Sequence, residues 1–419
     1  MNINWKRILL LIGFIAAVIL IGYLLYFLFL KPTIPPTKPG VNINIEPGVL
    51  PGANVNANIP TAANINGALP GGVNVNIGPP SEIPPTTAIV SPVASGGLTK
   101  TTALTTTRVY QSALAADGKG VIYYDRSTGL FYTVSSSGKS TPLSDKVFYE
   151  VENITWAPNR QKAILEYPDG SNIVYDFSTN QQITLPNHWK DFGFSPNSSQ
   201  IVFKSIGTSA DNRWLAVANV DGTKATKIEI MGDQDLTVHP NWSPNNQVIA
   251  MYREYTANEQ QSLYFIGLNK ENFKSATLQG NDFQGQWSTQ GDRLLYSVYS
   301  GDSDYKPTLW IVEAQGENIG QNRRNLGLET WAAKCSFADN NTIYCAVPQS
   351  LSEGAGMFPD DLDNSPSDIY KIDLISGFKS KIAIPEGNQN INRIMISEGG
   401  NNLYFESKTD GRIYSIKLR

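Results

Sequence analysis

A short phrase that recurs along the chain constrains the fold more than any other feature. In each copy an aromatic or apolar residue is followed by Ser-Pro-Asn or a similar polar turn, and then by a β-rich run. Tight turns favour Ser, Pro, Asn, Asp and Gly, because these residues accept the backbone angles of a turn or hydrogen-bond to their own backbone. The four clearest copies read ITWAPNRQKAILEY from Ile154, FGFSPNSSQIVFKS from Phe192, PNWSPNNQVIAMYRE from Pro240 and GQWSTQGDRLLYSVY from Gly285. Weaker copies begin at Ser112, Cys335 and Ile394.

The residue just before each turn, here called the pre-turn residue, marks the period of the repeat. Successive pre-turn residues lie 42, 38, 48, 45, 50 and 59 positions apart. Each period holds about four β-rich runs without helical periodicity, which is the pattern of propeller blades. We expect the pre-turn residues to pack between neighbouring blades; they are Leu114, Trp156, Phe194, Trp242, Trp287, Phe337 and Ile396.

The repeat predicts an all-β fold, a seven-bladed β-propeller, with rings of six or eight blades as alternatives. A set of β-sandwiches is the competing architecture, but sandwiches would not repeat one turn phrase in this way. The last copy ends after three strands, at IYSIKLR, and lacks an outer strand. Because a closed ring leaves no exposed sheet edge, we expect the segment around 101–110, with its β-rich LTTTRVY, to supply the missing strand.

The phrase resembles the WD-like blade repeat of TolB-type propellers, and prolyl oligopeptidase propellers use related blades. The resemblance covers residues 108–419, clearly in four copies and less so in three, and it implies the blade type. TolB-type proteins carry a separate α/β domain before the propeller, where this chain has a Pro/Gly-rich segment, so a Tol-system role is not implied. The sequence also has no GxSxG elbow, which argues against a serine peptidase.

Near the N-terminus, residues 8–30 form an apolar run of 23 residues without charge or proline. At about 1.5 Å rise per residue, a helix of this length reaches roughly 34 Å and crosses a hydrocarbon core of about 30 Å. Lys6 and Arg7 precede the run, which favours a cytoplasmic segment 1–7 and an extracytoplasmic remainder. A cleaved signal peptide would need a shorter apolar core and a small-residue cleavage site. We therefore predict a signal-anchor and a single-pass protein of the cell membrane.

The next segment, residues 31–97, is rich in Pro, Gly, Asn, Ala and Val and contains no aromatic residue. Such a composition buries too little apolar surface to offset the entropy that ordering would cost. It predicts a disordered linker that holds the propeller, residues 98–419, away from the bilayer. The Asn-Val-Asn alternation would allow a short strand, but the prolines oppose it.

The charge balance and the cysteine count exclude several classes of function. The chain has 33 basic and 37 acidic residues, a net charge of -4, which argues against a nucleic-acid partner. Two cysteines and two histidines are too few for a typical zinc cluster, and no cofactor is expected. Cys335 and Cys345 flank a predicted hairpin turn, so they are a disulfide candidate in an oxidising compartment. Two free buried thiols are the alternative.

The connections between second and third strands are short in copies one, two and seven and long in copies three to six. The long ones, at 204–213, 252–261, 300–307 and 348–368, hold ten acidic and four basic residues, a net charge of -6. These connections leave a propeller on one face, so we expect a wall that binds a cationic or metal-bridged partner. Ordinary solvated insertions are the alternative. The candidate binding residues are Arg213, Arg253, Glu254, Tyr255, Asp302, Asp304, Tyr305, Met357, Phe358, Asp360, Asp361 and Asp363.

Two further groups of residues were considered for chemistry. Asp360, Asp361 and Asp363 offer oxygen ligands for calcium, but the Gly and Glu spacing of an EF-hand loop is missing, so no metal is expected. His239 precedes a pre-turn residue and is expected to line an inner strand. The sequence therefore favours a non-enzymatic module that binds a protein or an envelope component. The alternatives are a lyase, hydrolase or cyclase at the central mouth, with His188 or His239 beside carboxylates, and a structural or sensory spacer.

Overall fold

The computed structural model describes residue 20, residues 89–257 and residues 259–419. The predicted cytoplasmic segment, the membrane helix and most of the predicted linker lie outside these residues, apart from Leu20 and residues 89–97. Within the described part of the chain, no helix is both long enough and apolar enough to cross a membrane. Ile83–Arg419 form one compact unit, which is described below.

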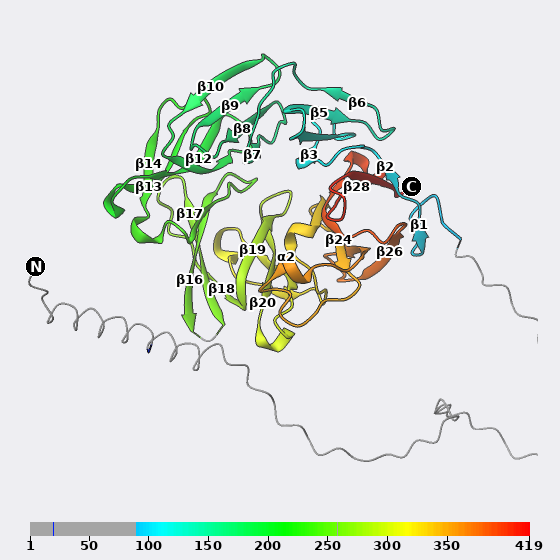
Figure 1. Ribbon diagram of the computed structural model, residues 1–419. Coiled ribbons are helices and arrows are strands. Elements are labelled where there is room, and N and C mark those ends of the chain that lie inside the picture. Colours follow the sequence, from blue (N-terminus) through cyan, green and yellow to red (C-terminus); the bar gives the residue numbers. More distant parts are fainter. Residues whose placement is uncertain (1–19, 21–88, 258) are drawn as a thin grey trace, which may run out of the picture. The chain divides into compact units, whose positions relative to one another are not determined.

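Seven sheets follow one another around a ring (Figure 1). In each sheet the strands follow in sequence order, except for an outermost strand from the N-terminal end in blades 6 and 7. This arrangement confirms the predicted seven-bladed propeller. Blade 1 holds β3 (Tyr110–Leu114), β4 (Val121–Asp125), β5 (Leu130–Val134) and β6 (Ser140–Pro142). Blade 2 holds β7 (Asn153–Trp156), β8 (Lys162–Glu166), β9 (Asn172–Asp176) and β10 (Gln181–Leu185). Blade 3 holds β11 (Trp189–Phe194), β12 (Gln200–Ile206), β13 (Arg213–Asn219) and β14 (Thr226–Ile230).

The remaining blades repeat this antiparallel order. Blade 4 holds β15 (Val238–Pro240), β16 (Val248–Ala257), β17 (Gln260–Gly267) and β18 (Ala276–Gln279). Blade 5 holds β19 (Asn281–Trp287), β20 (Arg293–Tyr299), β21 (Thr308–Glu313) and β22 (Arg324–Asn325). Blade 6 holds β23 (Cys335–Asp339), β24 (Thr342–Pro348), β25 (Ser367–Asp373) and β26 (Lys379–Pro385). Blade 7 holds β27 (Ile391–Ile396), β28 (Asn402–Ser407), β29 (Ile413–Lys417) and β2 (Thr102–Ala103).

The outer strand of blade 7 comes from the N-terminal end of the described unit, which confirms the predicted closure. β2 pairs antiparallel with β29, and Figure 1 shows it beside the C-terminal end of the chain. The backbone N–H of Leu104 extends the contact by donating to the carbonyl of Ile413, 2.8 Å away. The strand is shorter than the LTTTRVY run suggested, because residues 105–109 turn from blade 7 toward blade 1.

Blade 6 has a fifth strand that the sequence analysis did not predict. β1 (Leu98–Thr99) pairs parallel with β26 at the outer edge of the blade. Before β1, the N–H of Ala94 donates to the carbonyl of Lys417 (2.9 Å), and that of Gly96 donates to the carbonyl of Ile382 (2.7 Å). Residues in front of the predicted boundary at 98 therefore already bind blades 6 and 7.

The hydrophobic core of the described unit is divided into seven clusters, each shared by two neighbouring blades. Val121 of blade 1 and Tyr404 of blade 7 belong to one cluster, so the ring is closed. Each cluster includes one pre-turn residue, which confirms the predicted packing between blades. In order around the ring these are Leu114, Trp156, Phe194, Trp242, Trp287, Phe337 and Ile396.

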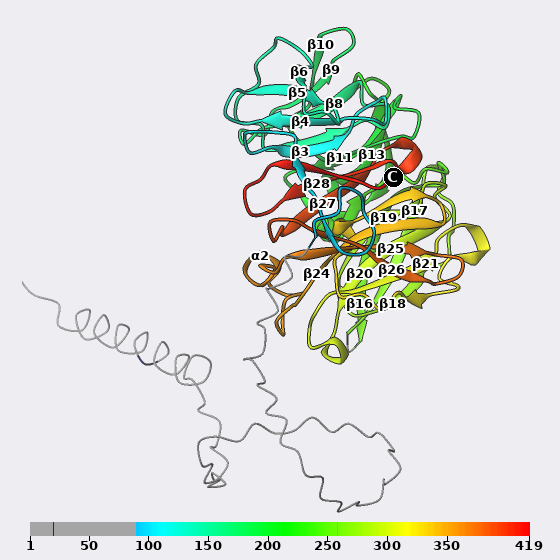
Figure 2. The same cartoon turned by 90° about the vertical axis from the view of Figure 1, so that its right-hand side faces the viewer.

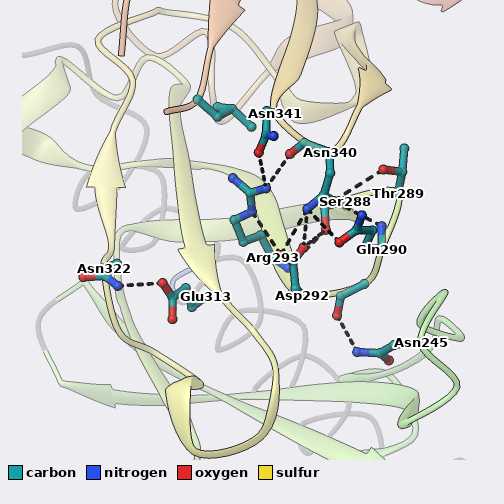
Figure 3. Close-up of polar contacts among 12 residues, drawn as sticks. Asn245, Ser288, Thr289, Gln290, Asp292, Arg293, Glu313, Asn322, Asn340 and Asn341 are labelled. Atoms are coloured by element: carbon teal, nitrogen blue, oxygen red, sulfur yellow. Dashed lines mark hydrogen bonds and ion pairs between the residues drawn. The ribbon is translucent and has the colours of Figure 1, made fainter. Parts of the chain in front are cut away.

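The turns after the pre-turn residues add hydrogen bonds between blades (Figure 3). The side-chain amide of Asn245 in blade 4 donates to the carbonyl of Gly291 in blade 5, 2.7 Å away. One blade further, the amide of Asn340 lies 3.1 Å from both carboxylate oxygens of Asp292. Gly291 has φ +71°, and a Cβ there would lie 2.8 Å from the backbone nitrogen of Asn245, so the turn requires glycine. The polar residues of the repeated phrase thus join turns as well as form them.

We expect Asn245→Ala to lower the free energy of unfolding more than Asn197→Ala does. The two residues hold the same turn position in blades 4 and 3, and each accepts a local backbone hydrogen bond. Among the described residues, Asn245 also bonds to the next blade, and such a bond contributes about 1 kcal/mol. Urea denaturation of both variants measures the difference; equal losses would show that the bond between blades contributes nothing.

Candidate functional site

The connections between second and third strands, and those between successive blades, emerge on one face of the ring, here called the loop face. The turns between first and second strands lie on the opposite face. Most of the exposed large apolar side chains in or beside connections belong to the loop face: Val147, Tyr149, Leu236, Tyr255, Met357 and Phe358. Ile375 and Phe378 lie on the opposite face. Apolar side chains gathered on one face are a feature of interaction surfaces.

Blade 4 departs from the prediction of a long connection at 252–261. β16 and β17 continue through this stretch as a hairpin, in which Tyr252 pairs with Tyr264 and Tyr255 with Gln261. The rings of Tyr252 and Tyr264 stack, with centroids 4.6 Å apart, which stabilises the extension. Arg253, Glu254 and Tyr255 therefore lie on a strand rather than in a loop. The connection of blade 3 is also shorter than predicted, because Lys204 and Arg213 belong to β12 and β13.

Three of the four predicted long connections meet. The carboxylate of Glu259, at the tip of the blade 4 hairpin, accepts the backbone N–H of Gly301 in blade 5 (3.1 Å). The N–H of Gly354 in blade 6 donates to the carbonyl of Asp304, 2.9 Å away. These bonds join a surface that we call the loop wall, made of Tyr255 and Glu259, residues 300–307 and residues 349–366.

The exposed side chains of the loop wall include acidic and large apolar residues. Four aspartates are exposed: Asp302, Asp304, Asp360 and Asp361. Beside them Tyr255 is 59% exposed, Phe358 57% and Met357 41%, and Tyr305 is half-buried. The short helix α2 (Pro359–Leu362) carries Asp360 and Asp361, and Figure 2 shows it projecting from one side of the ring. The wall therefore offers negative charge and apolar area together.

Asp363 does not belong to this exposed surface. It is 4% exposed, and its carboxylate lies 2.6 Å from the ammonium of Lys334 and 3.6 Å from that of Lys408. Lys408 of blade 7 also donates to the carbonyl of Pro359 (3.1 Å), so the two lysines fasten the blade 6 connection to the ring. The weak calcium interpretation does not fit this arrangement, because cations already occupy the carboxylate of Asp363. No group of three His, Cys, Asp or Glu in the described unit could hold a metal ion.

Arg213 and Arg253 also lie away from the loop wall. Arg213 pairs with Asp235 (3.0 Å) in the connection between blades 3 and 4. Arg253 pairs with Asp282 of β19 (3.7 Å), beside the centre of the ring. Glu254 is exposed and lines a cleft of about 540 Å³ between blades 3 and 4, together with Trp214. The structure therefore does not bring all the candidate residues together in one site.

The central mouth of the ring holds several charged groups. His239 on β15 lies on an inner strand, as predicted, and lines a cavity of about 370 Å³ with Arg253 and Asp282. Next to it, Lys204 and Asp191 form an ion pair at 2.7 Å. Partial burial in the central cavity, followed by the positive charges of Arg253 and Lys204, lowers the pKa of His239 below its usual value, although the residue as a whole remains exposed. His239 is therefore neutral at neutral pH.

Cys335 and Cys345 face each other on β23 and β24 and are joined by a disulfide, with Cα atoms 4.1 Å apart. His188 lies just before β11, with its ring against the edge of Trp189. The sequence analysis gave the two cysteines as a disulfide candidate and named His188 only in the enzyme alternative.

A cavity between blades 7 and 1 was not found by the sequence analysis. It measures about 700 Å³ and opens among Arg108, Tyr110, Arg126, Glu406 and Lys408. The available signal was the pair of arginines before β3 and after β4, at 108 and 126, where the long acidic connections are absent. Candidate binding residues were sought only in the long connections of copies three to six, so this pair was missed.

No protein-family model matches the chain, and no curated protein matches it by sequence. Its fold is similar to that of solved propellers. An oligogalacturonate lyase in complex with manganese is 13% identical, with a TM-score of 0.53, and the match covers 76% of this chain and 93% of that one. The β-propeller domain of Cps50 (Swd1) from Myceliophteria thermophila is 9% identical, with a TM-score of 0.50, covering 76% and 100%. At these identities the likeness shows the fold alone.

Removing the carboxylate of Asp363 should destabilise the chain strongly, because Lys334 would remain buried without its counter-ion. Breaking a buried pair in this way costs about 3–5 kcal/mol. Asp363→Ala is therefore expected to lower the free energy of unfolding by that order in urea denaturation. Lys334→Met combined with Asp363→Ala should recover part of the loss. Asp360→Ala, at the exposed neighbour, is the control; an equal effect at both aspartates would contradict the role of the pair.

His239 should make the chain less stable in mild acid. Its pKa is lowered in the folded chain, so between that pKa and the usual 6.5 the unfolded chain binds more protons. Stability then falls as the pH drops through this window and is unaffected above it. His239→Gln should lose less stability than the parent between about pH 7.5 and pH 5 in urea denaturation, with His188→Gln as the control. The same pH dependence in the parent and His239→Gln would contradict this assignment.

Proposed function

We propose that this chain is a binding module whose loop wall captures a cationic protein surface. The observation that carries the proposal is the fixed arrangement of exposed carboxylates around exposed Tyr255, Met357 and Phe358. Opposite charges on two proteins speed their association and disfavour partners of like charge, whereas buried apolar side chains supply most of the affinity. The wall combines both on one surface.

The hydrogen bonds within the wall support this function. Glu259 joins the blade 4 hairpin to blade 5, and Gly354 joins blade 6 to the same connection. A surface held in one conformation loses little entropy when it binds. Solvated insertions without a role would not require these contacts between three blades.

The proposal includes attachment to a membrane, which rests on the sequence. The apolar run at 8–30 and the Pro/Gly-rich segment at 31–97 favour a single-pass anchor and a linker that presents the propeller outside the cytoplasm. The bond between Cys335 and Cys345 is compatible with such an oxidising compartment. The TolB-type blade repeat remains a resemblance in this picture.

A second candidate function is an enzyme at the central mouth. His239 beside Asp282 and Arg253 favours it, because a neutral histidine can act as a general base and an arginine can stabilise developing negative charge. One solved propeller of similar fold is an oligogalacturonate lyase, although the described residues provide no ligand set for the manganese of that protein. Release of unsaturated products from oligogalacturonate, abolished by His239→Gln, would support this alternative.

Neutralising the loop wall should weaken capture of cationic partners. Asp360→Asn combined with Asp361→Asn removes two exposed charges, and each exposed pair contributes about 0.2–1 kcal/mol, so affinity should fall about twofold to thirtyfold. The measurement is calorimetric binding of a lysine- and tyrosine-rich peptide to the unit Ile83–Arg419 at low and high salt. The difference in peptide affinity between the parent and the double variant should be smaller at high salt, because salt screens exposed charges.

The matched control removes two exposed charges elsewhere. Glu229 lies on the outer strand of blade 3 and Glu317 in the connection after β21, both outside the loop wall. Glu229→Gln combined with Glu317→Gln should leave peptide affinity unchanged. Equal weakening in both double variants would reduce the effect to net charge and would refute a specific site.

A further inference from the structure

The cavity between blades 7 and 1 is formed by the segment that closes the ring, whereas the loop wall is formed by connections within blades 4, 5 and 6. Its floor includes residues 107–110, which connect β2 to blade 1. The N–H of Val109 donates to the carbonyl of Gly411 (2.7 Å), and the N–H of Ile413 donates to the hydroxyl of Thr105 (3.0 Å). The cavity therefore exists because the N-terminal segment closes the ring, and it lies outside the blades that carry the wall.

Two arginines of this cavity have no counter-ion among the described residues. Within the described unit, no carboxylate lies within 4 Å of a nitrogen of Arg108 or Arg126, although eleven other lysines and arginines form such pairs. Both side chains are exposed, so the cost of leaving them unpaired is small, and their donors remain available to a ligand.

The guanidinium of Arg126 is also held in one orientation before any ligand binds. Its guanidinium carbon lies 3.5 Å from the centroid of the Tyr110 ring, and the Tyr110 hydroxyl donates to the carbonyl of Glu152 in blade 2. Stacking uses the face of the guanidinium and leaves its N–H groups free along the edge, where a carboxylate binds with two parallel bonds. The stem of Arg108 packs against Gly411, where an added Cβ would clash with the Arg108 Cγ.

The other groups in the cavity indicate what kind of anion fits. The carboxylate of Asp125 accepts from Ser127 (2.8 Å) and Thr107 (3.2 Å), and that of Glu406 accepts from Ser112 (3.0 Å). These two negative charges repel a dianion more than a monoanion, which disfavours phosphate. Both carboxylates line the cavity and accept hydrogen bonds from hydroxyl groups of the chain. A ligand with its own hydroxyl groups would find acceptors in them.

We propose that this cavity binds a small hydroxylated carboxylate, such as a sugar acid, through a fork of Arg126 with Arg108 beside it. A volume of about 700 Å³ accommodates a ligand of that size. Lys408 adds positive charge at the rim, but its own donors are taken by the carbonyls of Pro359 and Asp363. The site is independent of the loop wall, so either can fail without the other.

The test uses the full-length chain in detergent and calorimetry with glucuronate, glucose and inorganic phosphate as probes. Glucuronate and glucose differ by one carboxylate, so binding of glucuronate alone is the expected result. Arg126→Leu should weaken glucuronate binding about tenfold to a hundredfold, the range of a charge-assisted bond. Arg126→Lys should also weaken it, because an ammonium cannot form the fork.

Arg323→Leu is the matched control, because Arg323 also lies over an aromatic ring, that of Trp310, but outside the cavity. The Arg323→Leu variant should bind glucuronate with the affinity of the parent chain, whereas the Arg108→Leu variant should bind it more weakly. Unchanged melting temperatures would show that the variants fold. Equal binding of glucuronate and glucose, phosphate binding as tight as glucuronate, or full affinity in Arg126→Leu would each overturn the proposal.

Discussion

Packing between neighbouring blades is the interaction on which the rest of the structure depends. A four-stranded blade has two apolar faces and cannot bury them alone, so each cluster of the core draws residues from two blades. The ring is complete only when blades 7 and 1 also pack. That contact includes Leu104 and Val109, which follow β2 in the N-terminal segment. The strand that closes blade 7 therefore also covers the last interface of the ring.

The sequence predicted the parts of this fold that repeat locally. The pre-turn residues and their polar turns recur with every blade, so blade number, inter-blade packing and the closing strand followed from one pattern. Contacts that occur only once in the ring could not be predicted from a repeated pattern. β1 is two residues long and pairs with β26, far away in the sequence. Asp363 looked like one more exposed acidic residue, and only the approach of Lys334 and Lys408 explains its burial.

The two faces of the ring have different physical roles. On the face of the repeated turns, the side chains of Asn245 and Asn340 each bond to a neighbouring blade, so replacing either residue removes a contact that joins two blades. The loop face carries connections of very different length without changing the sheets beneath them. Long connections there remain ordered because they bond to one another or, like residues 349–366, to lysines of the ring. Binding residues can therefore vary on this face while the scaffold is retained.

Charge is distributed unevenly over the loop face. Exposed aspartates lie over blades 5 and 6, whereas the unpaired arginines at 108 and 126 lie over the junction of blades 7 and 1. Between them, at the central mouth, Arg253 pairs with Asp282 and Lys204 with Asp191, so the charges of these pairs cancel locally. A partner with positive charge would be drawn to one side and an anionic group to the other. Such a field orients an approaching molecule before contact, because turning it round would bring like charges together.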